Sequence, residues 1–105
     1  MNKIHELLIK NMKSARKKLG YSQQRLAELC SLSTSFIGDV EIGKKFPSAN
    51  SLLKISESLG LKPYQLFMEN EEKRVFEKFN LLSKVQKDLI ETISRDIEDV
   101  VRKYL

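Results

Sequence analysis

Apolar residues recur along the chain with the spacing of helix faces. Near the N-terminus, Leu8, Met12, Ala15 and Leu19 follow one another at intervals of four, three and four residues, which places them on one side of a helix over residues 3–19. Glycine (4) and proline (2) are scarce, and β-branched residues do not cluster into the alternating runs of strands. The pattern predicts an all-α chain.

Residues typical of helix ends divide the first two-thirds of the chain into short segments. Ser22, Ser33 and Ser48 are expected N-caps, and Gly20, Gly43 and Gly60 are expected stops. We therefore expect helices over residues 23–30, 34–42 and 49–59, with a tight connection between the first two. Pro63 suits the first turn of a fifth, short helix that ends around Phe67.

Composition shifts after Met68, and two further helices are expected there. The first covers Glu69 to Phe79, and residues 80–82 break it. Ser83 and Gln86 form a capping box that begins a last helix of about 20 residues. The sequence thus predicts a domain at residues 1–68 and a helical segment at residues 69–105.

Basic residues are concentrated in the first part of the chain. Residues 1–67 hold 11 lysines and arginines against 5 acidic residues, whereas residues 68–105 hold 8 against 9. A basic domain joined to a neutral appendage is typical of a module that binds a polyanion. A solvated lysine-rich surface is the alternative that charge alone leaves open.

Several classes of protein find no support in the sequence. The single cysteine, Cys30, provides no disulfide framework; it occupies an apolar core position, and a reducing cytoplasm is the expected location. No apolar run reaches the roughly 20 residues of a membrane span, and no secretory signal is recognisable. The sequence has one isolated histidine, His5, and neither a metal-ligand cluster nor a glycine-rich phosphate loop. These features argue against an enzyme, a metal site or a cofactor.

The strongest functional pattern lies between Ser22 and Val40. Two short capped helices are joined by a very tight turn, and Ala27 is small where the helices must nearly touch. Ile37 and Val40 are spaced to face inward from the second helix, with Leu26 and Leu32 completing a small core. This is the helix-turn-helix pattern, in which the second helix projects its outer face into the DNA major groove.

From Leu8 to Phe67 the chain resembles the Cro/C1-type, or XRE-like, helix-turn-helix regulators. The matching residues keep the family's order and spacing: residues 15–23 (ARKKLGYSQ), Leu26-Ala27-Glu28, residues 33–41, Gly43-Lys44-Lys45, Pro47-Ser48, residues 52–55 and residues 64–67. The resemblance implies a five-helix, lambda-repressor-like domain whose third helix enters the major groove. Repression is the commoner outcome in this family.

The resemblance also implies roles for particular residues. Gln23 corresponds to a phosphate contact at a helix N-terminus. Thr34, Ser35 and Asp39 correspond to positions that face base edges or nearby backbone. The remaining expected DNA-binding residues are Phe36 and Gly38, beside that face, and Lys44 and Lys45, in a loop that meets the sugar-phosphate chain.

Arg16 and Glu41 are expected to form a structural ion pair between the first helix and the end of the third. Three positions depart from the family pattern. Ser31 stands where the turn usually has glycine. A non-glycine residue with positive φ at this position is strained by roughly 1–2 kcal/mol. Gly38 weakens its helix by about 1 kcal/mol relative to alanine, and the Asp39 carboxylate would repel phosphates, although it can accept a hydrogen bond from cytosine.

The C-terminal helices carry an apolar stripe that suits association with a second copy. Its expected dimerisation residues are Phe76, Phe79, Leu89, Ile93, Ile97, Val100 and Tyr104. Folding back on the first domain is the alternative for this stripe. The sequence and the resemblance together predict a homodimeric repressor that binds a pseudopalindromic double-stranded operator. The alternative function is that of an antitoxin-like protein that pairs with a toxin, or of a restriction-modification controller.

Overall fold

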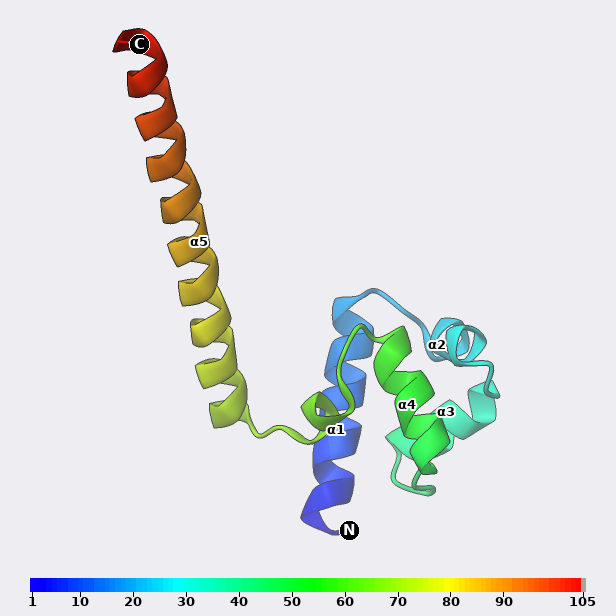
Figure 1. The fold of residues 1–105 in the computed structure, drawn as a ribbon. Coiled ribbons are helices and arrows are strands. Elements are labelled where there is room, and N and C mark those ends of the chain that lie inside the picture. Colours follow the sequence, from blue (N-terminus) through cyan, green and yellow to red (C-terminus); the bar gives the residue numbers. More distant parts are fainter. Residues whose placement is uncertain (105) are drawn as a thin grey trace. The chain divides into compact units, whose positions relative to one another are not determined.

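The computed structural model describes residues 1–104, and all of the regular structure in that range is helical (Figure 1). Five α-helices and one 3₁₀ helix follow one another: α1 (Lys3–Lys18), α2 (Gln23–Cys30), α3 (Thr34–Glu41), α4 (Ala49–Ser58), η1 (Pro63–Phe67) and α5 (Asn70–Tyr104). The predicted all-α class is confirmed. The contacts divide the chain into two compact units, the first covering Met1–Glu69 and the second beginning at Asn70.

Serine side chains begin three of the helices, as the sequence predicts. The hydroxyl of Ser22 accepts a hydrogen bond from the Arg25 amide at 2.9 Å, and Ser48 caps α4 in the same way. Because the first amides of a helix have no partner within it, each serine satisfies one of them and fixes the starting residue. The N-cap of α1, Asn2, was not predicted.

The core of the first unit gathers apolar side chains from all five of its helices. The buried members are Leu8, Met12, Leu26, Ala27, Cys30, Ile37, Val40, Ile55, Leu59 and Leu66. Asn11 is also buried, and its amide nitrogen donates to the carbonyl oxygens of Leu66 (2.7 Å) and Met68 (2.9 Å). This side chain ties α1 to the end of η1, and so closes the domain around α2 and α3.

One expectation about the later elements is confirmed and one needs correction. The predicted fifth helix is the 3₁₀ helix η1, one turn in which the Gln65 amide bonds to the Lys62 carbonyl three residues back. The predicted pair of C-terminal helices is wrong, because α5 runs without interruption from Asn70 to Tyr104.

The reason for the continuous helix lies in the weakness of the expected break. Asn80 lowers helix stability by at most about 0.7 kcal/mol relative to alanine, and Ser83 by a similar amount. No glycine or proline occurs after Pro63 in the sequence. Ser83 and Gln86 therefore lie inside α5 and do not form a capping box. No helix within residues 1–104 is long and apolar enough to span a bilayer.

Candidate nucleic-acid interface

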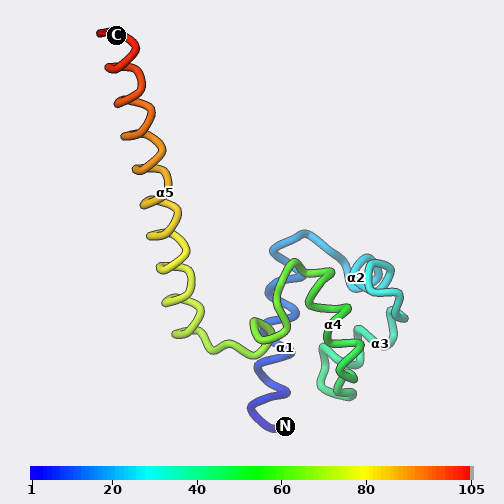
Figure 2. The backbone as a smooth tube through the Cα atoms, viewed as in Figure 1, coloured from blue at the N-terminus to red at the C-terminus, as the bar shows by residue number. Residues whose placement is uncertain are grey.

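The turn between α2 and α3 is built from three consecutive residues with distinct backbone roles. Ser31 adopts a left-handed conformation (φ 55°, ψ 39°), and the Leu32 amide donates to the Ala27 carbonyl at 2.9 Å. Ser33 then returns to an extended conformation and caps α3 through its hydroxyl, 3.0 Å from the Phe36 amide. The chain thus changes direction between α2 and α3 within a few residues (Figure 2).

Helix α3 has one face inside the domain and one face outside. Ile37, Val40 and Glu41 are buried, whereas Thr34 and Ser35 are exposed at the start of the helix. Phe36, Gly38 and Asp39 are partly buried, and the Phe36 ring packs against the core. Phe36 therefore combines a structural role with its place beside the outer face.

The hydroxyl groups of Thr34 and Ser35 are not used by the fold. Ser33 supplies the cap of α3, and neither of the next two hydroxyls makes a hydrogen bond within residues 1–104. The local alternative, in which these residues cap the helix, is thereby excluded. Each hydroxyl can both donate and accept, so both are able to meet a phosphate or a base edge.

The Asp39 carboxylate has a basic partner in the following loop. Its Oδ2 atom lies 3.4 Å from Lys45 Nζ, and the side chains are 23% and 54% exposed respectively. The carbonyl oxygen of Asp39 also accepts from the amides of Lys44 (2.8 Å) and Lys45 (3.2 Å). Asp39 therefore fixes the loop that carries both lysines, and Lys45 offsets the repulsion between this carboxylate and a polyanion.

Arg16 and Glu41 form a bidentate ion pair beneath the interface. Arg16 Nε and Nη2 lie 2.8 and 3.0 Å from the two carboxylate oxygens, and Arg16 Nη1 donates to the Tyr21 carbonyl at 2.9 Å. The Glu41 side chain is fully buried, with 0% exposure, and that of Arg16 is 12% exposed. The pair joins α1 to the last turn of α3 and to the chain just before α2.

Gln23 extends this network to the surface. Its Nε2 atom donates to Glu41 Oε1 at 3.1 Å, which directs the amide group across the N-terminus of α2 toward α3. A Cβ atom on Gly38 would stand 3.7 Å from Gln23 Oε1, an ordinary contact distance. Gln23 retains a second amide hydrogen for a phosphate, and its link to Glu41 was not apparent from the sequence.

The structure places the expected DNA-binding residues on three adjoining pieces of the first unit. Gln23 begins α2, five residues lie on α3 with Asp39 toward its end, and the two lysines follow in the next loop. Lys44 is exposed. The expected dimerisation residues all lie on α5, where Phe76 is partly buried and the other six are exposed.

The available groups suit recognition of a polyanion. The expected residues offer hydroxyls, an amide and two ammonium groups, and Lys45 pairs with the one carboxylate among them. Within residues 1–104 no group of three metal-binding side chains occurs. Cys30 is 2% exposed and its Sγ lies 3.7 Å from the Lys54 carbonyl oxygen. Burial raises the pKa of this thiol, which lowers its reactivity.

Comparisons with known proteins agree with this architecture. The profile of the helix-turn-helix family matches residues 12–66. A prophage-derived, uncharacterised HTH-type transcriptional regulator of Bacillus subtilis, YonR, is 40% identical over 50 residues, which are 48% of this chain and 46% of the relative. The match therefore spans just under half of that relative's length.

Two solved structures share the fold. The hypothetical transcription factor NHTF from Neisseria has a TM-score of 0.67 and 27% identity, over 71% of this chain and 84% of its own. The restriction-modification controller protein C.AhdI from Aeromonas hydrophila has a TM-score of 0.56 and 33% identity, over 58% and 92%. The chain belongs to the helix-turn-helix family, in its Cro/C1-type (XRE-like) form, and so to a family of DNA-binding transcriptional regulators.

Proposed function

We propose that this protein binds a specific pseudopalindromic DNA operator as a homodimer and represses transcription from the promoter that the operator overlaps. The observation that carries the proposal is the exposed outer face of α3, where the hydroxyls of Thr34 and Ser35 remain uncommitted. The buried pair of Arg16 and Glu41 holds that helix rigidly from behind. A rigid helix with free polar groups is suited to reading base edges in the major groove.

Phosphate contacts supply the sequence-independent part of the affinity. Lys44 is an exposed cation, and the N-terminus of α2 at Gln23 adds partial positive charge. Each phosphate neutralised by a lysine releases counterions, so log affinity falls by about 0.9 per contact for each unit of log salt concentration. Binding should consequently weaken steeply with salt.

The second unit provides the surface for dimerisation. None of the described residues of α5 is buried, and Leu89, Ile93 and Ile97 are each more than half exposed. An apolar stripe of this length is stable in water when a second surface covers it. A second copy of the same stripe brings two α3 helices to one operator, as a two-fold sequence requires.

The specificity claim is tested by fluorescence anisotropy on a duplex enriched from a random library. Wild-type protein should bind the enriched duplex at least about 1,000-fold more tightly than a scrambled one. Replacing Thr34, Ser35 and Asp39 with alanine should flatten that ratio, while affinity for the scrambled duplex changes little. Alanine at Asn50 and Glu57, exposed residues of α4, is the control. Specificity that survives the triple change contradicts the assignment.

The phosphate claim is tested by the salt dependence of the same binding curves. Lys44→Ala with Lys45→Ala should reduce the slope of log affinity against log salt by about 1 to 2 units. The matched control is Lys84→Ala with Lys87→Ala, which removes the same charge from the polar side of α5. If the two double variants reduced the slope equally, the salt dependence would come from net charge and not from contacts made by Lys44 and Lys45.

A second candidate function is control of restriction-modification genes. It is favoured by the 33% identity to the controller protein C.AhdI. A controller of this kind, or an antitoxin-like protein, would also bind a protein partner through α5. Co-expression with the products of neighbouring genes, followed by purification through a tag on this chain, separates these possibilities from a regulator that binds DNA alone.

A further inference from the structure

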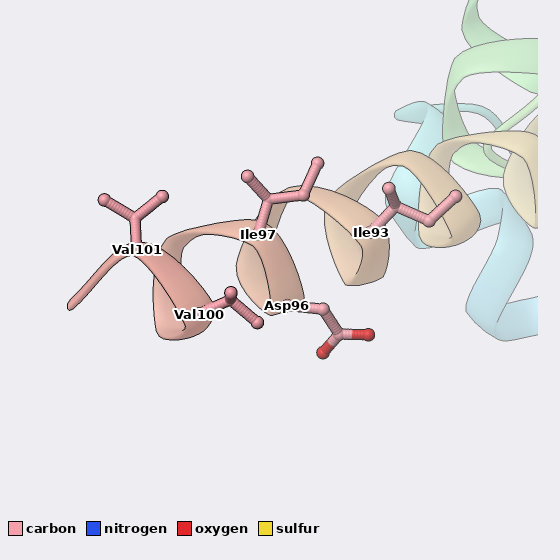
Figure 3. A pocket seen from close by; sticks show the side chains of 5 residues that line it. All are labelled: Ile93, Asp96, Ile97, Val100 and Val101. Atoms are coloured by element: carbon pink, nitrogen blue, oxygen red, sulfur yellow. The ribbon is translucent and has the colours of Figure 1, made fainter. Parts of the chain in front are cut away.

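A row of charged residues borders the apolar stripe of α5 on one side. At 100° per residue, Glu71, Lys78, Asp96 and Lys103 lie within one narrow strip along the helix, and the uncharged Val85 and Thr92 lie between them. All four charged side chains are exposed, and none forms an ion pair within residues 1–104. Figure 3 shows Asp96 beside Val100, a residue of the apolar stripe.

The charges in this row are inverted about a single point. Glu71 and Lys103 are equally distant from residue 87, one on each side, and their signs are opposite. Lys78 and Asp96 are also equally distant from residue 87 and opposite in sign. One row further out, Arg74 and Asp99 follow nearly the same relation.

Pairing direction decides which edges of two identical helices meet. When a two-fold axis runs across the helices, as in an antiparallel pair, an edge meets the same edge of the partner in reverse order. The row then brings Lys78 opposite the partner's Asp96, and Glu71 opposite the partner's Lys103. Each complementary contact occurs twice in the dimer.

A parallel pair brings this row against the opposite edge of the partner. That edge holds Phe76, Ser94 and Val101 nearest in height to Lys78, Asp96 and Lys103, and its one acidic residue is Glu72. Glu71 would approach the partner's Glu72, and Lys78 and Asp96 would have no opposite charge at their own height. Like charges at close range disfavour this arrangement.

The apolar residues are compatible with the same midpoint. In the antiparallel arrangement Leu82 lies opposite the partner's Ile93, and Val75 lies opposite the partner's Val100. Val85 meets the partner's Leu89 near the centre. The apolar stripes therefore remain in register over the full length that the charged row requires.

We propose that two copies of α5 pair in antiparallel orientation about residue 87, with the charged row fixing both direction and register. This inference rests on the homodimer proposed above and specifies its geometry. The two Asn70 residues, where the helices begin, are then about 50 Å apart along the pair, at 1.5 Å of rise per residue.

Charge reversal tests the pairing of Lys78 with Asp96. Lys78→Glu alone and Asp96→Lys alone should each weaken dimerisation about tenfold in sedimentation equilibrium, since each creates two like-charge contacts. The double variant should restore wild-type affinity. In a parallel dimer the two positions are about 27 Å apart, and the double variant would not be rescued. Lys84→Glu with Glu91→Lys, on the polar side, is the control and should leave dimerisation unchanged.

Spin-label distances test the direction itself. The labels are placed in a Cys30→Ala background whose circular dichroism spectrum is unchanged. The two labels at position 91 should be separated by less than about 30 Å in either direction of pairing. The two labels at position 102 should be separated by about 45 Å or more in the antiparallel pair. Short distances at both positions would overturn the antiparallel proposal and leave the homodimer intact. No distance at either position would contradict the homodimer as well.

Discussion

The ion pair between Arg16 and Glu41 offers the sharpest test of how the interface is held. Arg16→Met keeps an unbranched side chain of similar length but removes three hydrogen bonds, two to Glu41 and one to the Tyr21 carbonyl. The Glu41 carboxylate, which is fully buried, then keeps a single donor, Gln23 Nε2 at 3.1 Å. An almost unpaired charge is left inside the domain.

The expected loss follows from that burial. Removing one partner of a buried ion pair destabilises a protein by about 3–5 kcal/mol. A unit of this size is stable by about 0.05–0.15 kcal/mol per residue, or roughly 3–10 kcal/mol in total. Arg16→Met should therefore remove at least about 30% of the stability of the first unit, and lower its melting temperature by about 12 °C or more.

Urea titration followed by the methyl NMR signals of Leu26 and Ile37 measures this unit separately from α5. Arg25→Met is the matched control, because Arg25 makes one 3.4 Å contact to Glu28 and both side chains are more than half exposed. It should change stability by less than about 1 kcal/mol. The double variant Arg16→Met with Glu41→Leu should be more stable than Arg16→Met alone.

Two results would refute this reasoning. One is a loss below about 1 kcal/mol for Arg16→Met, which would equal the value of a surface pair. The other is a double variant whose destabilisation equals the sum of the two single changes, since contacting partners must be coupled.

Three further substitutions or treatments have defined outcomes. Ser31→Gly should stabilise the domain by about 1 kcal/mol because it relieves the left-handed backbone, and Ser31→Ala should not; equal thermal melts would contradict this. Gly38→Ala should stabilise α3 by about 0.5–1 kcal/mol, since the added Cβ meets no clash. The same methyl group should weaken operator binding in anisotropy, because it stands where the duplex approaches the helix; unchanged binding would contradict a close approach at Gly38. Burial raises the pKa of Cys30, so the folded state keeps its proton where the unfolded thiol has lost it, and stability should fall as pH rises above the ordinary thiol pKa. Cys30→Ala should remove that pH dependence in urea titrations.

The local features of the first unit were predictable because they depend on neighbouring residues. A serine before a helix satisfies an amide three residues away, and Ser22, Ser33 and Ser48 all do so. The left-handed turn at Ser31 follows from the short connection between two helices. Such contacts need no knowledge of the rest of the fold.

The failures concern features whose energies are small or whose partners are distant in sequence. The break expected at residues 80–82 depended on propensities too weak to interrupt a long helix. Asn11 was overlooked, although it follows Leu8 by three residues and so lies on the core face of α1. Its partners, the carbonyls of Leu66 and Met68, are more than 50 residues away in the sequence.

The site shows the same division. The positions of Thr34 and Ser35 on the outer face follow from helical spacing once Ile37 and Val40 are turned inward. Helical spacing does not predict the hydrogen bond from Gln23 to Glu41 or the ion pair of Asp39 with Lys45. Both depend on the angle between helices, which the packing of the whole domain determines.

The central claim, that the outer face of α3 contacts DNA, is tested most directly by amide NMR shifts on titration with the enriched duplex. The largest changes should fall on Gln23, residues 33–39 and Lys44, while the amides of α5 should shift little. Largest changes on α4 or α5, with α3 unaffected, would contradict the account.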